Sequence, residues 1–309
     1  GTVQGLLIEN VIGWNPGMRN ESNYQEVLDI YGSSDEVNGA PPIQDVVVRG
    51  CWFFHTPERG GDYLTYAKVN VRHILYENNI FGPSEAGGDG NANVCIGTPA
   101  GNPDPSKPAN LQTVVRNNVF VGLKGDAPLG IRNASEAWVY NNVFYDNSGP
   151  DARAVIELRG NEFPLGPVHI FNNIFAGNKP LRKGGTFFWV RDELPSVFMH
   201  DHNLYYDNVV DTDAPFDDEA SGVYNQDPLL IEASIPSVEP LPTSLDVLDE
   251  LRARFGLSSG SPAVNHGLDA LSVDGHPSWS EDASRRWDIG QNPRPTEDSW
   301  DLGVNELSP

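Results

Sequence analysis

A short pattern of apolar and polar residues recurs along the first two thirds of the chain. In its clear copies, which end at residues 81, 120, 144 and 175, two asparagines follow an apolar run and precede a β-branched residue and a Phe. Weaker copies occupy 7–12, 47–53 and 199–205. Short apolar runs bounded by turn-forming residues are typical of β-strands. The pattern therefore predicts an all-β fold built from a repeated unit.

The spacing of the copies indicates which repeated fold this is. With the second Asn of each pair as reference, the copies fall at positions 10, 51, 79, 118, 142, 173 and 203, in steps of 24 to 41 residues. A helical repeat or a propeller blade keeps a tighter length, whereas a β-solenoid absorbs insertions in the loops of its coils. We therefore expect a parallel β-helix over residues 1–235 and a tail over 236–309.

The recurring asparagines have two interpretations. Stacked carboxamides on neighbouring parallel strands can hydrogen-bond to one another, so we expect the second Asn of each pair to point inward and form a ladder through Asn79, Asn118, Asn142 and Asn173. An Asn-Asn pair also favours turns by itself.

A second β-rich segment follows each Asn-Asn strand, at 27–32, 64–68, 94–98, 129–133, 155–160 and 187–192. We align these segments on an inward residue, taken as Ile30, Tyr66, Ile96, Ile131, Leu158 and Val190. Because side chains alternate along a strand, two outward columns remain. The first contains Asp29, Thr65, Cys95, Gly130, Glu157 and Trp189, and the second contains Tyr31, Ala67, Gly97, Arg132, Arg159 and Arg191. Three arginines are thus predicted on consecutive coils, about 4.8 Å apart.

The tail contains one predicted helix. Leu248, Leu251 and Phe255 recur at helical spacing between Ser244 and Phe255, with acidic residues early and basic residues late. We expect this short α-helix to lie against the end of the solenoid. The chain starts inside a coil, which would expose a sheet edge and an apolar core. Either upstream residues are missing, or another chain, such as a second copy, covers that coil.

Composition narrows the classes of partner. The 43 acidic and 20 basic residues give a net charge of −23, which excludes nucleic acid and anionic membrane surfaces as favoured partners. No run of about 18 apolar residues occurs, so membrane insertion is not expected. The acidity has two explanations, solubility in a salty habitat or calcium binding. Gly88 to Asn93 offers oxygen ligands at alternate positions, which makes calcium a candidate cofactor held by Asp89, Asn91 and Asn93.

Motifs after residue 225 carry a resemblance to a known group of proteins. The chain reads Gln-Asp-Pro-Leu-Leu at 226–230, Ser-Pro-Ala-Val-Asn-His-Gly at 261–267, Trp-Asp-Ile-Gly-Gln-Asn-Pro-Arg-Pro at 287–295 and Trp-Asp-Leu-Gly-Val-Asn-Glu at 300–306. With the Asn-Asn coils, these motifs resemble the secreted right-handed parallel β-helix proteins of the pectate-lyase-like superfamily. The resemblance implies that fold and a secreted, extracellular or cell-surface location.

Within this superfamily, the chondroitinase B and alginate lyase group is the nearest comparison. Its members resemble this chain in an Arg before an Asn-rich turn, here Arg132, and in an upstream Lys, here Lys124. This likeness implies a polysaccharide lyase acting on uronic-acid polymers. Their paired-Glu calcium site has no counterpart here.

The chemistry of the outward columns fits an acidic polysaccharide. The guanidinium fork of an arginine matches a carboxylate or sulfate two hydrogen bonds at a time, and exposed aromatic rings pack on sugar faces. The expected substrate-binding residues are Arg191, Trp189, Glu157, Tyr31 and Lys68. The arginines could instead be internal ion-pair partners of Glu157, Asp192 and Glu193.

A lyase needs a neutralised carboxylate, a base and a proton donor. Arg132 or Arg159 would neutralise the carboxylate of the substrate, and Lys124 or Lys68 would be the base that removes the proton beside it. Tyr66 could donate a proton, although the alignment turns it inward. A hydrolase would need two carboxylates, such as Glu157 with Asp29 or Asp192, and is less favoured. The alternatives to an enzyme are a non-catalytic glycan-binding or adhesin module and a structural β-solenoid subunit of an extracellular filament.

Overall fold

The computed structural model describes most of the solenoid and much of the tail. The described residues are 3–14, 26–32, 42–56, 63–68, 71–84, 92–97, 112–149, 152–160, 165–181, 185–191, 195–209, 219–277, 279, 288, 294, 300–304 and 306.

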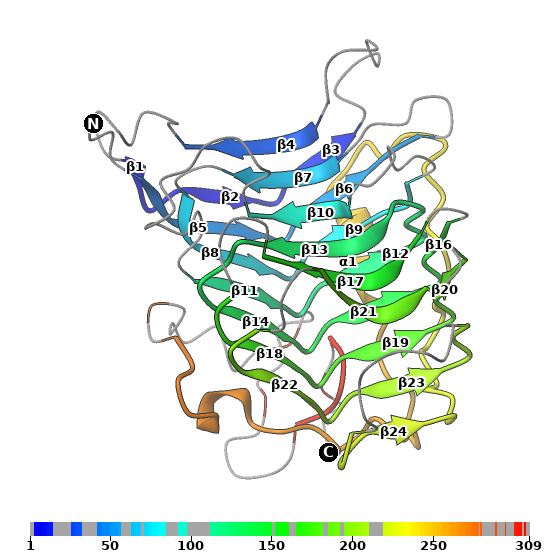
Figure 1. Cartoon of the computed structure of the whole chain (residues 1–309). Helices are drawn as coiled ribbons and strands as arrows, with labels where there is room; N and C mark the ends of the chain where they lie inside the picture. The colour runs from blue at the N-terminus through cyan, green and yellow to red at the C-terminus, as the bar shows by residue number, and fades with distance from the viewer. Residues whose placement is uncertain are drawn as a thin grey trace.

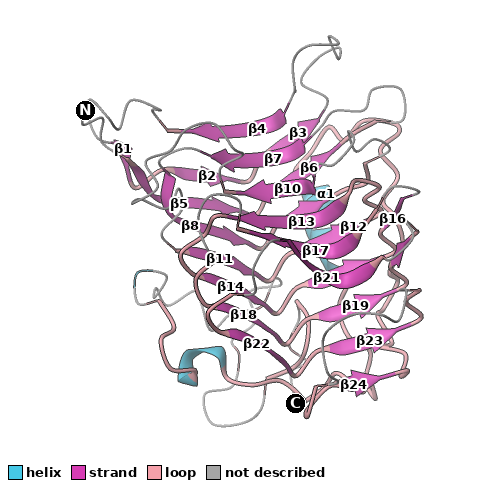
Figure 2. Ribbon diagram, in the orientation of Figure 1, coloured by secondary structure: helices cyan, strands magenta, loops and turns pink. Residues whose placement is uncertain are grey.

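Three long sheets run along the described part of the chain, and every pairing between their strands is parallel (Figures 1 and 2). Sheet 1 contains β1 (Val3–Gln4), β2 (Leu7–Glu9), β5 (Ile43–Arg49), β8 (Val71–Glu77), β11 (Thr113–Arg116), β14 (Ala137–Tyr140), β18 (Val168–Phe171) and β22 (Phe198–Asp201). Sheet 2 contains β3 (Ile12–Trp14), β6 (Trp52–Phe54), β9 (Ile80–Phe81), β12 (Val119–Val121), β15 (Val143–Tyr145), β19 (Ile174–Ala176), β23 (Leu204–Tyr206) and β24 (Val223–Tyr224).

Sheet 3 contains β4 (Glu26–Tyr31), β7 (Tyr63–Lys68), β10 (Ala92–Ile96), β13 (Ala127–Arg132), β17 (Ala154–Arg159) and β21 (Thr186–Arg191). A short additional ladder joins β16 (Ser148–Gly149) to β20 (Lys179–Pro180). The chain visits sheets 1, 2 and 3 in turn, and each strand pairs with its equivalent in the next coil. The predicted parallel β-helix is confirmed.

The second Asn of each pair forms the predicted ladder. Its carboxamide nitrogen donates to the carboxamide oxygen of the next coil over 2.9 to 3.0 Å, in the series Asn79, Asn118, Asn142, Asn173 and Asn203. The last member donates to Glu219 Oε1 over 2.7 Å. These side chains are fully buried, so the ladder satisfies groups that water cannot reach.

The first Asn of each pair makes the turn from sheet 1 to sheet 2. Asn78, Asn117, Asn141 and Asn172 have φ between 54° and 58°, a left-handed conformation that Asn tolerates better than most residues. Both interpretations of the Asn-Asn pair are therefore correct, one for each residue. In the first coil, Glu9 pairs with Arg49, so Asn10 is the turn residue and Val11 takes the ladder position. The sequence reference at position 10 was wrong by one residue.

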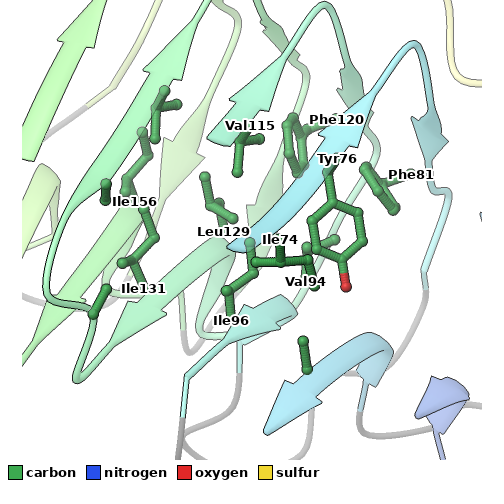
Figure 3. Packing of buried hydrophobic residues seen from close by; sticks show 14 of the residues in the cluster. Ile74, Tyr76, Phe81, Val94, Ile96, Val115, Phe120, Leu129, Ile131 and Ile156 are labelled. Carbon is green, nitrogen blue, oxygen red and sulfur yellow. The ribbon is translucent and has the colours of Figure 1, made fainter. Parts of the chain in front are cut away.

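The interior of the solenoid is apolar. A row of stacked aromatic rings runs along sheet 2, with centroid distances of 4.5 to 6.0 Å, through Phe53, Phe81, Phe120, Phe144, Phe175, Tyr205 and Tyr224. Figure 3 shows Phe81 and Phe120 packed with Tyr76 and Val115 of sheet 1 and with Leu129 and Ile131 of sheet 3. All three sheets thus contribute side chains to one core.

The tail covers the outside of two sheets. The helix α1 (Asp246–Arg254) buries Leu248 and Leu251, with Phe255 just beyond, against the outward residues of sheet 2. The helix was predicted, but its expected position at the solenoid end was wrong: it lies along the side, because Trp52, Val119 and other outward residues of sheet 2 are apolar and need cover. No helix within the described ranges has the length and apolar character needed to cross a membrane.

The remainder of the described tail hydrogen-bonds to the turn asparagines of three consecutive coils. Arg294 donates to Asn117 Oδ1, Asn141 donates to the Asp301 carbonyl, and Asn172 donates to the Leu268 carbonyl. The Arg294 side chain is fully buried and pairs with Glu306 over 2.7 Å. We call the described residues Leu268, Arg294, 300–304 and Glu306 together the strap.

Candidate functional site

The arginine column predicted on sheet 3 is present. Arg132 pairs in register with Arg159, and Arg159 pairs with Arg191, on β13, β17 and β21. Consecutive parallel strands place these Cα atoms about 4.8 Å apart.

The predicted alignment was wrong by one residue in β7. Ile30 pairs with Ala67, so Tyr66 lies in the column of Asp29 and Cys95, and Lys68 lies in the column of Tyr31. The alignment had favoured the large aromatic residue as the inward one. Here the interior is already filled by Tyr76, whose side chain lies beside Thr65, so small residues at 65 and 67 face inward. Tyr66 is consequently outside the solenoid interior.

Arg132 is an ion-pair partner inside the outer layer. Its Nε and Nη2 donate to Glu157 Oε2 over 3.1 and 2.6 Å, and the two side chains are only 3% and 2% exposed. The missing side chain at Gly130 makes room for this pair: a Cβ there would lie 3.2 Å from Glu157 Oε2 and 2.7 Å from Ala92 Cβ. For Arg132 and Glu157, the alternative of an internal ion pair is therefore correct.

The other two arginines become more exposed along the column. Arg159 is half-buried and Arg191 is exposed. Asp192 and Glu193, the acidic residues expected near them, lie outside the described residues. A graded series results, from a neutralised guanidinium at β13 to a solvent-facing one at β21.

Trp189 has a cation on its ring. The guanidinium carbon of Arg153 lies 4.7 Å from the Trp189 ring centroid, and Arg153 Nε lies 3.0 Å from Asp126 Oδ1. Sequence reasoning missed Arg153, because neither the Trp189 contact, from the next coil, nor the Asp126 contact, from the preceding one, is visible as a local motif. The Trp189 side chain is half-buried and pairs in register with Glu157 of the preceding coil.

Lys68 is tightly held. Its Nζ lies 2.8 Å from Glu26 and 3.2 Å from Asp29, and 4.4 Å from the centroid of the Tyr66 ring. Burial alone opposes its charge, but the hydrogen bond and charge of Glu26, followed by Asp29, outweigh burial and raise the pKa of Lys68 above its ordinary value. Lys68 is therefore an ammonium at neutral pH, which argues against the predicted role as a base. The Tyr31 ring, which is 52% exposed, has its centroid 5.7 Å from the same ammonium.

Lys124 and Arg132 are not brought together. Lys124 precedes β13 and Arg132 ends it, so the length of a six-residue strand, roughly 17–20 Å, lies between them. Lys124 instead lies near Asp146, where burial raises the pKa of the carboxyl and the charges of Lys179 and Lys124 oppose that rise. The predicted pairing of a base with a neutralising cation is therefore not assembled from these two residues.

Only Asn93 of the predicted calcium ligands lies within the described residues. Asp89 and Asn91 lie outside the described residues. Asn93 is buried, with its Nδ2 donating to Ser84 Oγ over 3.2 Å and its Oδ1 accepting from the Gly125 amide over 2.9 Å. Both ends of this carboxamide are used inside the protein, so Asn93 holds the coil together. Within the described ranges, no group of three or more His, Cys, Asp or Glu side chains could hold a metal ion.

An aromatic cluster lies on the same outer face. The rings of Tyr63 and Tyr66 lie tilted against each other with centroids 4.4 Å apart and pack with Cys95, all of them buried. Burial raises the pKa of the Cys95 thiol to about 11, so this cysteine is not a thiolate at neutral pH. Period-two alternation with Thr65 and Ala67 inward could have placed Tyr66 on the outer face, but it would have turned Tyr63 inward, because the two tyrosines are three residues apart.

The charges of this face differ from those of the whole chain. The described side chains on and beside sheet 3 include the cations Lys68, Arg132, Arg153, Arg159 and Arg191 and the carboxylates Glu26, Asp29, Asp126 and Glu157. In the chain as a whole, acidic residues outnumber basic ones by 43 to 20. An anion is therefore repelled less by these described side chains than the net charge of the chain suggests. The chain matches no known family model and no curated protein at a significant level.

Proposed function

We propose that the protein binds an acidic polysaccharide along the outer face of β13, β17 and β21, with Arg159 and Arg191 contacting its carboxylates or sulfates. The observation that carries this proposal is the register of the arginine column. Like charges at this spacing repel, and Glu157 neutralises Arg132 at one end of the column. An anionic chain lying along the column would place further counter-charges beside Arg159 and Arg191.

The chemistry of arginine supports a carboxylate or sulfate ligand. Its planar donor fork offers two parallel hydrogen bonds to one oxyanion. The half-buried Trp189 ring and the exposed Tyr31 ring lie in the two outward columns and offer apolar faces to sugar rings. The resemblance of the coils and tail to the pectate-lyase-like superfamily agrees with this ligand class and with a secreted protein.

We propose binding and not cleavage, because binding does not require a catalytic base beside the arginines. The sequence-based expectation of a lyase requires a base close to the neutralising arginine, whereas Lys124 lies at the other end of β13 and Lys68 keeps its proton. Cleavage therefore stays a prediction, and the binding experiment also tests it.

The experiment compares alginate, pectate, a sulfated glycosaminoglycan and neutral dextran as ligands for the purified protein, with and without calcium. We expect binding to the anionic polymers alone and weaker binding at high salt. Arg159→Ala and Arg191→Ala should each weaken binding by about 1.5–3 kcal/mol, the usual contribution of a hydrogen bond to a charged group. Ultraviolet absorbance of unsaturated products would reveal lyase activity.

Arg254→Ala is the matched control, because Arg254 is a surface cation on α1, over sheet 2. It should leave both affinity and melting temperature unchanged. If Arg159→Ala lowers the melting temperature but not the affinity, Arg159 is an internal ion-pair partner and the site is misassigned. Equal binding of dextran would also contradict the proposal.

A further inference from the structure

One polar group on the outer face of sheet 3 is buried without an internal partner. The Tyr66 hydroxyl makes no hydrogen bond in the part of the chain that the structure describes, although the residue is only 3% exposed. A buried hydroxyl without a partner is unfavourable by roughly 1–3 kcal/mol. Such a group in a folded protein calls for an explanation, and a bound molecule is one.

The ring of Tyr66 has two close neighbours. The Tyr63 ring lies tilted against it with its centroid 4.4 Å away, and the Lys68 ammonium lies 4.4 Å from the Tyr66 centroid. The ammonium is itself held by Glu26 and Asp29. The hydroxyl is therefore a rigid donor, and its ordering for a ligand requires little further loss of side-chain entropy.

The Tyr66 side chain and the arginine column lie on the same outer side of sheet 3. Tyr66 pairs with Cys95, and Cys95 pairs with Gly130, whose strand ends at Arg132. Two coil steps, roughly 10 Å, therefore separate β7 from β13. The intervening strand β10 carries only Cys95 and Gly97 at these positions, and the Glu157 carboxylate reaches over Gly130 to Arg132. Burial raises the pKa of the Tyr66 phenol above its ordinary value, and the charge of Arg132 is near enough to oppose that rise.

We propose that the Tyr66 hydroxyl is a ligand contact, donating a hydrogen bond to a carboxylate or hydroxyl oxygen of a sugar residue bound next to the arginine column. This inference rests on the proposed function and extends the site by two coils, from β13 back to β7. It gives the aromatic cluster a role in selecting a sugar with an acceptor oxygen at that position.

The test removes only the hydroxyl. Tyr66→Phe should weaken binding of the best anionic polymer about tenfold, as expected for loss of one hydrogen bond to a charged or polar ligand group. The melting temperature should stay the same or rise, since the free protein loses a buried group without a partner. Tyr76→Phe is the matched control: its side chain lies inside the solenoid beside Thr65, so the affinity should not change.

The outcomes separate this inference from the proposed function. If the wild-type protein binds no anionic polymer, both are overturned. If the wild-type protein binds and Tyr66→Phe binds equally well, only the Tyr66 contact is wrong. A fall in melting temperature for Tyr66→Phe with unchanged affinity would mean that the hydroxyl stabilises the fold, and would also overturn the inference.

Discussion

Two arginines in one column have opposite surroundings. Arg132 is almost fully enclosed with Glu157, whereas Arg191 faces solvent on the same side of the sheet. The same residue type therefore has different energetic consequences at positions that the sequence pattern treats as equivalent. The difference arises from the neighbouring coil, which supplies a carboxylate to one arginine over the space left by Gly130.

Replacing Arg132 by Met should strongly destabilise the protein, because it leaves the Glu157 carboxylate buried and unpaired. We expect the free energy of unfolding to fall by about 3–5 kcal/mol, as measured by chemical denaturation. Arg191→Met is the control and should change it by less than about 0.5 kcal/mol. If both variants had the same free energy of unfolding, the buried Arg132–Glu157 pair would contribute no more to stability than the exposed Arg191.

At the scale of elements, the Asn-Asn pair explains how each coil is built. Its first residue turns the chain from sheet 1 to sheet 2 and its second joins the internal ladder. Asn142 illustrates the density of this bonding: its Oδ1 accepts from the amide and the carboxamide of Asn118, and its Nδ2 donates to Asn173, Val115 and Tyr140.

Asn142→Ala should therefore lower the free energy of unfolding by at least about 3 kcal/mol, since several buried groups lose their partners together. The control is Asn208→Ala, at the end of a second ladder from Asn147 through Asn178. Asn208 is half-buried, so water can replace its hydrogen bonds and the loss should be smaller. Thermal and urea unfolding would both measure the difference. A larger loss for Asn208→Ala would contradict the account of the ladder.

The sequence predicted the elements better than it predicted their surroundings. The Asn-Asn repeat and the helix followed from periodicity, because each depends on residues close together in the chain, and the arginine column followed from aligning the repeated coils. The register of β7 and the burial of Arg132 did not follow, since they depend on Tyr76 filling the interior and on Glu157 from another coil. The position of α1 along sheet 2 required knowing that the outward residues of that sheet are apolar.

At the scale of the whole molecule, the strap changes how the solenoid can unfold. A solenoid is held by contacts between adjacent coils, so its ends can open independently of its middle. Here the strap hydrogen-bonds to Asn117, Asn141 and Asn172 and thereby joins three coils through residues distant in sequence. The coils and the strap should consequently unfold as one cooperative unit.

Arg294→Ala should break this unit, because it removes the bond to Asn117 and leaves Glu306 without its ion-pair partner. We expect a loss of about 3 kcal/mol or more, by the same reasoning as for any buried ion pair. Amide hydrogen exchange should show the strap losing protection before the coils do. Protection that falls equally in both would mean that the strap does not open separately.

The direction of the asparagine ladder has a consequence for the length of the protein. Every carboxamide donates toward the same end, so each coil offers an acceptor on one side and a donor on the other. Excising the stretch from Asn142 to the residue before Asn173 would leave such a row continuous, and duplicating it would do the same. The interior is thus indifferent to the number of coils. The strap does depend on that number, because it hydrogen-bonds to the turn asparagines of three particular coils. In this molecule the strap therefore limits the number of coils that the fold can accommodate.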